Sequence, residues 1–90
     1  YVKFCEKVKA YFTSLYIDAE VVIERREDGD VLLIKQHQFS DIMPPTIPIS
    51  SLYKRYMFGT AYLTILDDME RSYEMLLNMK IKKRLQLGKN

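Results

Sequence analysis

The sequence predicts a small α+β domain, because the spacing of its apolar residues changes along the chain. Near both ends they recur every three or four residues, as on one face of a helix. Between these regions, an alternating segment at 19–26 and an apolar run at 31–34 flank an Asp-Gly pair, which is typical of a hairpin. We therefore expect a helix, an antiparallel hairpin, a short helix, a longer helix and a third strand from the tail. The helices should cover one face of the small sheet.

The length and composition favour one domain over residues 1–90. No stretch of 18 apolar residues is present, so we expect no membrane partner. The single cysteine, Cys5, cannot form an intrachain disulfide, which is typical of a reducing compartment. A cytoplasmic location is the resulting expectation.

The first helix is predicted over residues 2–16. One side of it is apolar at spacings of three and four, and charged residues fill the other side. The apolar residues are Phe4, Cys5, Val8, Tyr11, Phe12 and Leu15. We expect this side to pack in the core.

The acidic residues at 27–30 are interpreted as a turn and not as a metal site. Asp28-Gly29 suits a two-residue type I′ turn, which would pair Ile23 with Ile34 and Arg25 with Leu32. A calcium loop needs alternating oxygen ligands, a central glycine and a distal glutamate, and this segment lacks that pattern. We expect no bound metal.

Three prolines after Phe39 predict a loop, with a short extended piece at 46–47. Ser50 or Ser51 is the predicted cap of a short helix through Phe58. Gly59 would end that helix as its C′ residue, and Thr60 would cap the next one. That longer helix has an apolar stripe formed by Tyr62, Leu66, Met69, Tyr73 and Leu76.

The spacing of the apolar residues in the tail, 80–87, fits both a strand and a helix. Leu85 and Leu87 alternate with polar residues, as in a strand, whereas Leu77, Ile81 and Leu85 are spaced by four, as in a helix. Periodicity leaves both open, and the predicted fold takes the strand.

The second half of the chain carries a spaced pattern of apolar and aromatic residues, with the run 31–34 upstream. It consists of Pro45-Thr46-Ile47, Tyr53, Tyr56, Gly59, Ile65-Leu66 and Tyr73. Over roughly residues 19–90 it resembles an uncharacterised bacterial family of gut Firmicutes type. The resemblance implies this order of elements, a Firmicute or phage source, and a chain that matches the N-terminal portion of longer members. It implies no activity. Pro48 departs from the pattern, which argues against a regular strand at 46–49.

No catalytic constellation is apparent, so we expect no catalytic residues, no cofactor and no enzymatic activity. His37 is the only histidine, and no serine lies in a nucleophile motif. Asp67 and Asp68 are adjacent on a predicted helix and point about 100° apart. With three glycines in the chain, a phosphate-binding loop is not expected.

Two groups of residues are candidates for binding. Tyrosines are enriched at protein interfaces, and the candidates are Tyr53, Tyr56, Tyr62 and Tyr73. Basic side chains of segment 80–89 could contact nucleic acid, namely Lys80, Lys82, Lys83, Arg84 and Lys89.

The leading hypothesis is a protein-interaction module, whose partner is another protein or a second copy of the chain. One form is a small inhibitor from a phage or mobile element that blocks a host protein. The alternatives are a domain that binds nucleic acid weakly through the tail, and an N-terminal fragment of a larger uncharacterised protein.

Overall fold

The computed structural model describes residues 1–87 and confirms the α+β class. Helix α1 (Val2–Leu15) is followed by the hairpin of β1 (Ala19–Arg26) and β2 (Gly29–Gln36). A 3-10 turn, η1 (His37–Phe39), and a loop lead to β3 (Thr46–Pro48). Helices α2 (Ile49–Met57) and α3 (Tyr62–Leu87) complete the order.

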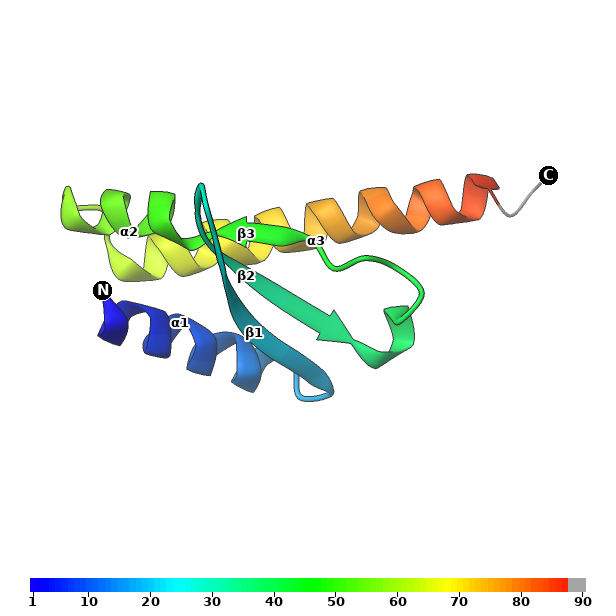
Figure 1. Ribbon diagram of the computed structural model, residues 1–90, viewed down its shortest axis with the longest axis horizontal. Coiled ribbons are helices and arrows are strands. Elements are labelled where there is room, and N and C mark those ends of the chain that lie inside the picture. Colours follow the sequence, from blue (N-terminus) through cyan, green and yellow to red (C-terminus); the bar gives the residue numbers. More distant parts are fainter. Residues whose placement is uncertain (88–90) are drawn as a thin grey trace.

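The three strands form one antiparallel sheet in the order β1-β2-β3, and the helices pack on it (Figure 1). In β3 the buried Ile47 lies between two exposed residues, whereas β2 contains three consecutive buried residues, Leu32, Leu33 and Ile34. The buried core combines side chains from all three helices and all three strands: Phe4, Val8, Phe12, Val21, Leu32, Ile34, Ile47, Ile49, Ile65, Leu66, Met69 and Tyr73. The predicted core side of the first helix is therefore confirmed except at Leu15, which is 42% exposed.

The predicted hairpin is present, but its predicted register is wrong by two residues. The strands pair Val21 with Ile34 and Ile23 with Leu32, and Arg26 lies opposite Gly29. This register places apolar side chains opposite one another, whereas the predicted one would have set Arg25 against Leu32. The turn residues are therefore 27 and 28, and no residue other than glycine has a positive φ in the described chain, so the type I′ turn is also wrong.

Pro48 belongs to β3, so the expectation that it would prevent a regular strand there is wrong. It lies opposite Val31. The Asp30 amide donates to Ser50 Oγ at 3.1 Å, and Ser50 lies on the β3 side of β2. Because amides alternate in direction along a strand, the other even-numbered residues of β2 also point their amides away from β1. In an antiparallel ladder the neighbouring Val31 then points its own amide toward β1. Pro48 thus occupies a position where no amide is needed.

The start of α2 also differs from the prediction. The helix begins at Ile49, directly after Pro48, and no side chain caps it. Neither Ser50 nor Ser51 is the cap, because β3 runs directly into the helix and Ser50 already lies in its first turn. The Ser50 hydroxyl instead accepts the amide hydrogen bond from Asp30 in β2.

Gly59 ends α2 as predicted. Its φ is +103°, and its amide donates to the Tyr56 carbonyl at 3.1 Å, while the Thr60 amide donates to the Arg55 carbonyl at 3.0 Å. These two bonds form a Schellman motif. Helix α3 begins at Tyr62, so Thr60 closes α2 and does not cap α3.

The tail does not form a third strand, since α3 continues to Leu87 and the third strand is β3. Residues 79–87 contain no glycine or proline and are rich in lysine, leucine and arginine, which favour a helix. A bidentate contact from Arg84 Nη1 to both carboxylate oxygens of Asp41, at 2.9 and 3.0 Å, attaches this end to the loop before β3. The alternation of Leu85 and Leu87 is therefore only a short coincidence within a helix.

We expect Gly29→Val to destabilise the domain by about 1 kcal/mol or more, because Gly29 has a φ of +129°. A Cβ atom there would also lie 3.1 Å from Ser50 Oγ. The measurement is the free energy of urea unfolding. Asp28→Val is the matched control at the neighbouring exposed turn position, and equal effects of the two substitutions would contradict the backbone argument.

Gly59→Ala should also destabilise, by about 1 kcal/mol, since alanine resists the positive φ at this position. No atom lies within 4 Å of the added Cβ, so the cost comes from the backbone alone. Gly59→Asn should cost less, because asparagine tolerates positive φ better than alanine does. A stabilising Gly59→Ala would show that α2 and α3 prefer to form one helix.

Candidate protein-interaction surface

The reversal between α2 and α3 exposes several large apolar side chains at one end of the molecule. Phe58 is 91% exposed, Leu63 is 76% exposed and Met57 is 64% exposed, and Tyr56 lies beside them. We call these four residues the turn surface. Figure 1 shows this reversal next to the start of α1. Neighbouring apolar groups of this size that remain in water commonly mark a binding surface.

The local sequence explains why these residues point outward. Ile49 and Tyr53, one helical turn apart, direct one side of α2 into the core. Phe58 follows the last turn of α2, where its amide donates to the Lys54 carbonyl at 3.0 Å. The Schellman bonds then fix the backbone on both sides of Gly59. The turn therefore fixes the backbone at Phe58, and the Phe58 side chain lies in the solvent.

A cluster of aromatic rings supports the turn surface from behind. Phe4 of α1 is its centre, with ring centroids 5.2 Å from Tyr53, 5.4 Å from Tyr56 and 6.2 Å from Tyr62. Tyr1 extends the cluster at 4.9 Å from Tyr53. Three of the four predicted interface tyrosines, Tyr53, Tyr56 and Tyr62, are thus brought together here. Edge-on and stacked contacts of this kind restrict side-chain motion.

Tyr73, the fourth predicted interface residue, is 1% exposed and lies in the core, so it offers no surface to a partner. Its hydroxyl accepts a bond from Gln36 Nε2 at 3.0 Å and donates to the Ile34 carbonyl at 3.5 Å. It shares the helical stripe of Leu66 and Met69, which face the sheet. Helical spacing alone could not separate a core tyrosine from an interface tyrosine.

The candidate nucleic-acid residues do not form one surface. Because the tail is helical, Lys80, Lys83 and Arg84 lie on one side of α3 and Lys82 lies on the other. Arg84 is already paired with Asp41. Lys89 falls outside the described residues. The basic charge available for phosphate contacts is therefore divided and partly neutralised.

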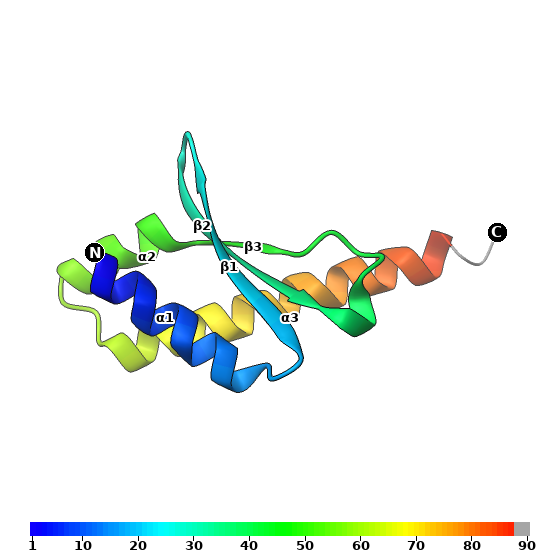
Figure 2. The same cartoon turned by 60° about the horizontal axis from the view of Figure 1, so that its bottom comes forward.

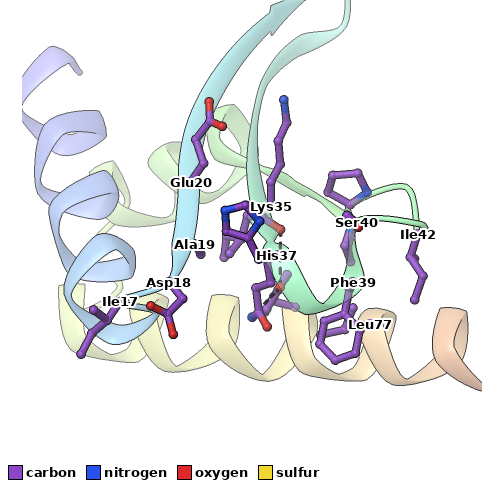
Figure 3. Close-up of a pocket in the computed structure, with 15 residues that line it drawn as sticks. Ile17, Asp18, Ala19, Glu20, Lys35, His37, Phe39, Ser40, Ile42 and Leu77 are labelled. Carbon is purple, nitrogen blue, oxygen red and sulfur yellow. Dashed lines mark hydrogen bonds between the residues drawn. The ribbon is translucent and has the colours of Figure 1, made fainter.

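A hollow of about 480 Å³ lies beside the end of the hairpin, between η1, the following loop and α3 (Figure 3). Phe39, Ile42 and Leu77 provide apolar walls. In Figure 3, Glu20 and Lys35 extend away from α3 and do not converge on the hollow. Gln36 and Tyr73 hydrogen-bond to each other at its base. The hollow thus has a mixed lining, with Asp18, His37 and Ser40 beside the apolar residues, and Gln36 and Tyr73 at its base are hydrogen-bonded to each other.

The ionisable side chains of the described residues are dispersed. Asp67 pairs with Arg71 at 3.2 Å and Asp68 with Arg55 at 2.8 Å, so the two aspartates face different partners. Within residues 1–87, no three histidine, cysteine or acidic side chains gather as metal ligands would. In the same part of the chain, no helix combines the length and apolar character needed to cross a membrane.

Sequence reasoning missed Met57, Phe58 and Leu63, which are the most exposed members of the turn surface. Phe58 was predicted only as the end of a helix. A usable signal was present, since two large apolar residues directly precede the helix-ending Gly59. Residues at such a reversal have few neighbours that could cover them.

Comparison with models of protein families, with curated proteins and with solved structures finds no match for this chain. The resemblance to an uncharacterised Firmicutes family therefore stays a prediction.

Several tyrosines should make the domain sensitive to alkali. Burial raises the pKa of the Tyr16 hydroxyl, and the nearby Glu74 carboxylate raises it further. Burial likewise raises the pKa of Tyr62 and of Tyr73. A raised pKa in the folded state means that folding favours the protonated phenol. The contribution of these phenols to folding stability is fully present below about pH 10, the pKa of tyrosine in the unfolded chain. It is lost as the pH rises through their higher pKa values in the folded state.

We therefore expect the free energy of unfolding in urea to fall as pH increases above about 10. Tyr16→Phe keeps the ring but removes the ionisable hydroxyl, so this variant should lose less stability over the same range. If the wild-type chain and Tyr16→Phe lose the same amount of unfolding free energy above about pH 10, the effect comes from groups other than the Tyr16 hydroxyl.

Proposed function

We propose that this domain is a non-enzymatic protein-interaction module that binds a partner protein through the turn surface. The observation that carries the proposal is Phe58, a large aromatic side chain held in the solvent by a rigid helix reversal. Aromatic residues that insert into a pocket of the partner contribute much of the energy of many interfaces. A preorganised anchor also loses less conformational entropy on binding than a flexible one.

The surroundings of Phe58 support this assignment. Met57 and Leu63 extend the apolar area on both sides of the reversal, and Tyr56 adds a ring with a polar end. Lys54 lies one helical turn before Phe58, so it can supply a polar rim. An apolar centre with a polar rim is the usual anatomy of a protein interface.

A small inhibitor from a phage or mobile element is one form that this function can take. Such a protein acts by covering a surface of its target and needs no catalytic group. The single cysteine is compatible with a cytoplasmic partner. The dispersed acidic side chains and the occupied polar groups of the hollow support binding over catalysis.

Nucleic-acid binding through the tail is the second candidate, and the exposed Lys82 and Lys83 favour it. With Arg84 paired to Asp41, about two or three phosphate contacts remain, for which the slope of log affinity against log salt would be about −2 to −3. We expect such binding to be weak and independent of sequence.

The experiment is a pull-down from a bacterial lysate with the wild-type chain and with Phe58→Ser, followed by measurement of Kd for the captured protein. We expect Phe58→Ser to weaken binding by about 2 kcal/mol or more, roughly 30-fold in Kd. Met43→Ser is the matched control, because Met43 is 78% exposed but lies on the loop before β3.

The lysate is treated with nuclease in a parallel arm. Capture that survives nuclease, is lost with Phe58→Ser and is kept with Met43→Ser supports the proposal. Capture that disappears with nuclease, or depends on Lys82 and Lys83 in place of Phe58, would support the nucleic-acid alternative and refute the turn surface as the binding site.

A further inference from the structure

One side of α3 is exposed along almost the whole helix. Its residues recur at spacings of three and four and all lie in the solvent: Asp67, Arg71, Met75, Asn78, Lys82 and Leu85. We call these six residues the outer face of α3. Met75 and Leu85 are both more than half exposed. The turn surface adjoins this face at the start of α3, because Leu63 lies one helical turn before Asp67.

Other elements pack on the remaining sides of α3. The Tyr11 hydroxyl of α1 donates to Glu70 at 3.4 Å, and Arg55 of α2 pairs with Asp68 at 2.8 Å. Beyond Leu77 the helix extends past the sheet, as both Figure 1 and Figure 2 show. A short projecting helix has little stability by itself in water, so a packing partner would stabilise it.

The charge of α3 changes sign along its length. Residues 62–75 contain four acidic side chains and one arginine. Residues 76–87 contain four basic side chains and no acidic one. On the outer face itself the charged residues are Asp67 and Arg71 in the first half and Lys82 in the second, since Asp68 and Glu70 contact α2 and α1. A second α3 helix in antiparallel orientation would place Lys82 of each copy near Asp67 of the other. A parallel orientation would oppose like charges.

We propose that two copies of this chain pair through the outer faces of their α3 helices, in antiparallel orientation about a two-fold axis beside Met75. Met75 then contacts Met75 of the second copy. Lys82 of one copy lies opposite residue 68 of the other copy. It is therefore within one helical turn of Asp67 of that other copy. The interface is isologous, since one patch meets itself. This inference goes beyond the proposed function, whose anchor Phe58 lies outside the outer face of α3.

The charge pattern also selects the register. A shorter overlap that joined only the projecting ends would set lysines against lysines. Pairing about Met75 overlaps the full helices and brings both sets of opposite charges together. Exposed charge pairs contribute little energy individually. They determine the orientation of the helices, whereas Met75 and its neighbours supply the apolar contact.

The test is the oligomeric state of the full chain, measured by sedimentation equilibrium over a range of concentrations. We expect a dimer whose Kd rises at least about tenfold with Met75→Glu, because two carboxylates would then meet at the axis. Met43→Glu is the control, since Met43 is also exposed, at 78% against 58% for Met75, but lies off the helix. Circular dichroism of each variant checks that the fold is retained.

Charge exchange tests the orientation. Lys82→Glu should weaken the dimer, and the double variant Lys82→Glu with Asp67→Lys should restore it. A chain that stays monomeric at every concentration, or a dimer insensitive to Met75→Glu, overturns the proposal. A dimer that charge exchange fails to restore contradicts the antiparallel arrangement. Phe58→Ser should leave the dimer intact, so failure of the partner-binding proposal remains a separate result.

Discussion

The reversal of the chain at Gly59 is the constraint on which the packing and the candidate surface both depend. Its positive φ allows α2 and α3 to fold back on each other within a few residues, and two Schellman bonds complete the turn. Ile49 of α2 and Ile65 of α3 then reach the same core. The same geometry leaves Phe58 without neighbours, so the feature that closes the core also creates the exposed anchor.

Polar contacts then fix how the hairpin lies on the helices. Ser50 of α2 accepts the Asp30 amide near the turn of the hairpin, and Gln36 binds the buried Tyr73 hydroxyl near its other end. These contacts attach one end of β2 to α2 and the other end to α3. Apolar burial favours contact in general, but these directional bonds select one arrangement.

The parts of the fold that could be predicted are those in which a local signal and tertiary packing agree. The first helix, β1 and the stop at Gly59 each have such a signal. The hairpin register could not be obtained from Asp28-Gly29 alone, because the pairing of Val21 and Ile23 with apolar partners outweighs the preference of the turn. The tail was ambiguous since its helical state is supported by the Asp41–Arg84 contact, which is distant in sequence. In the candidate site, tyrosine enrichment pointed to Tyr56 and to two supporting rings, Tyr53 and Tyr62, whereas Phe58 required knowledge of where the helix reversal points.

The two proposed surfaces have a joint consequence for binding. With α3 paired about Met75, the turn surface of each copy lies at an opposite end of the helix pair. Residues 62–75 span about 20 Å of helix, so the two turn surfaces would be roughly 40 Å apart. A partner with a single binding site would gain nothing from this arrangement. A partner that repeats its site at a similar spacing, such as an oligomer or filament, would be bound by both ends at once, because the second contact becomes intramolecular. The dimer would therefore bind a target with repeated sites more tightly than a target with one site, even if each turn surface binds weakly.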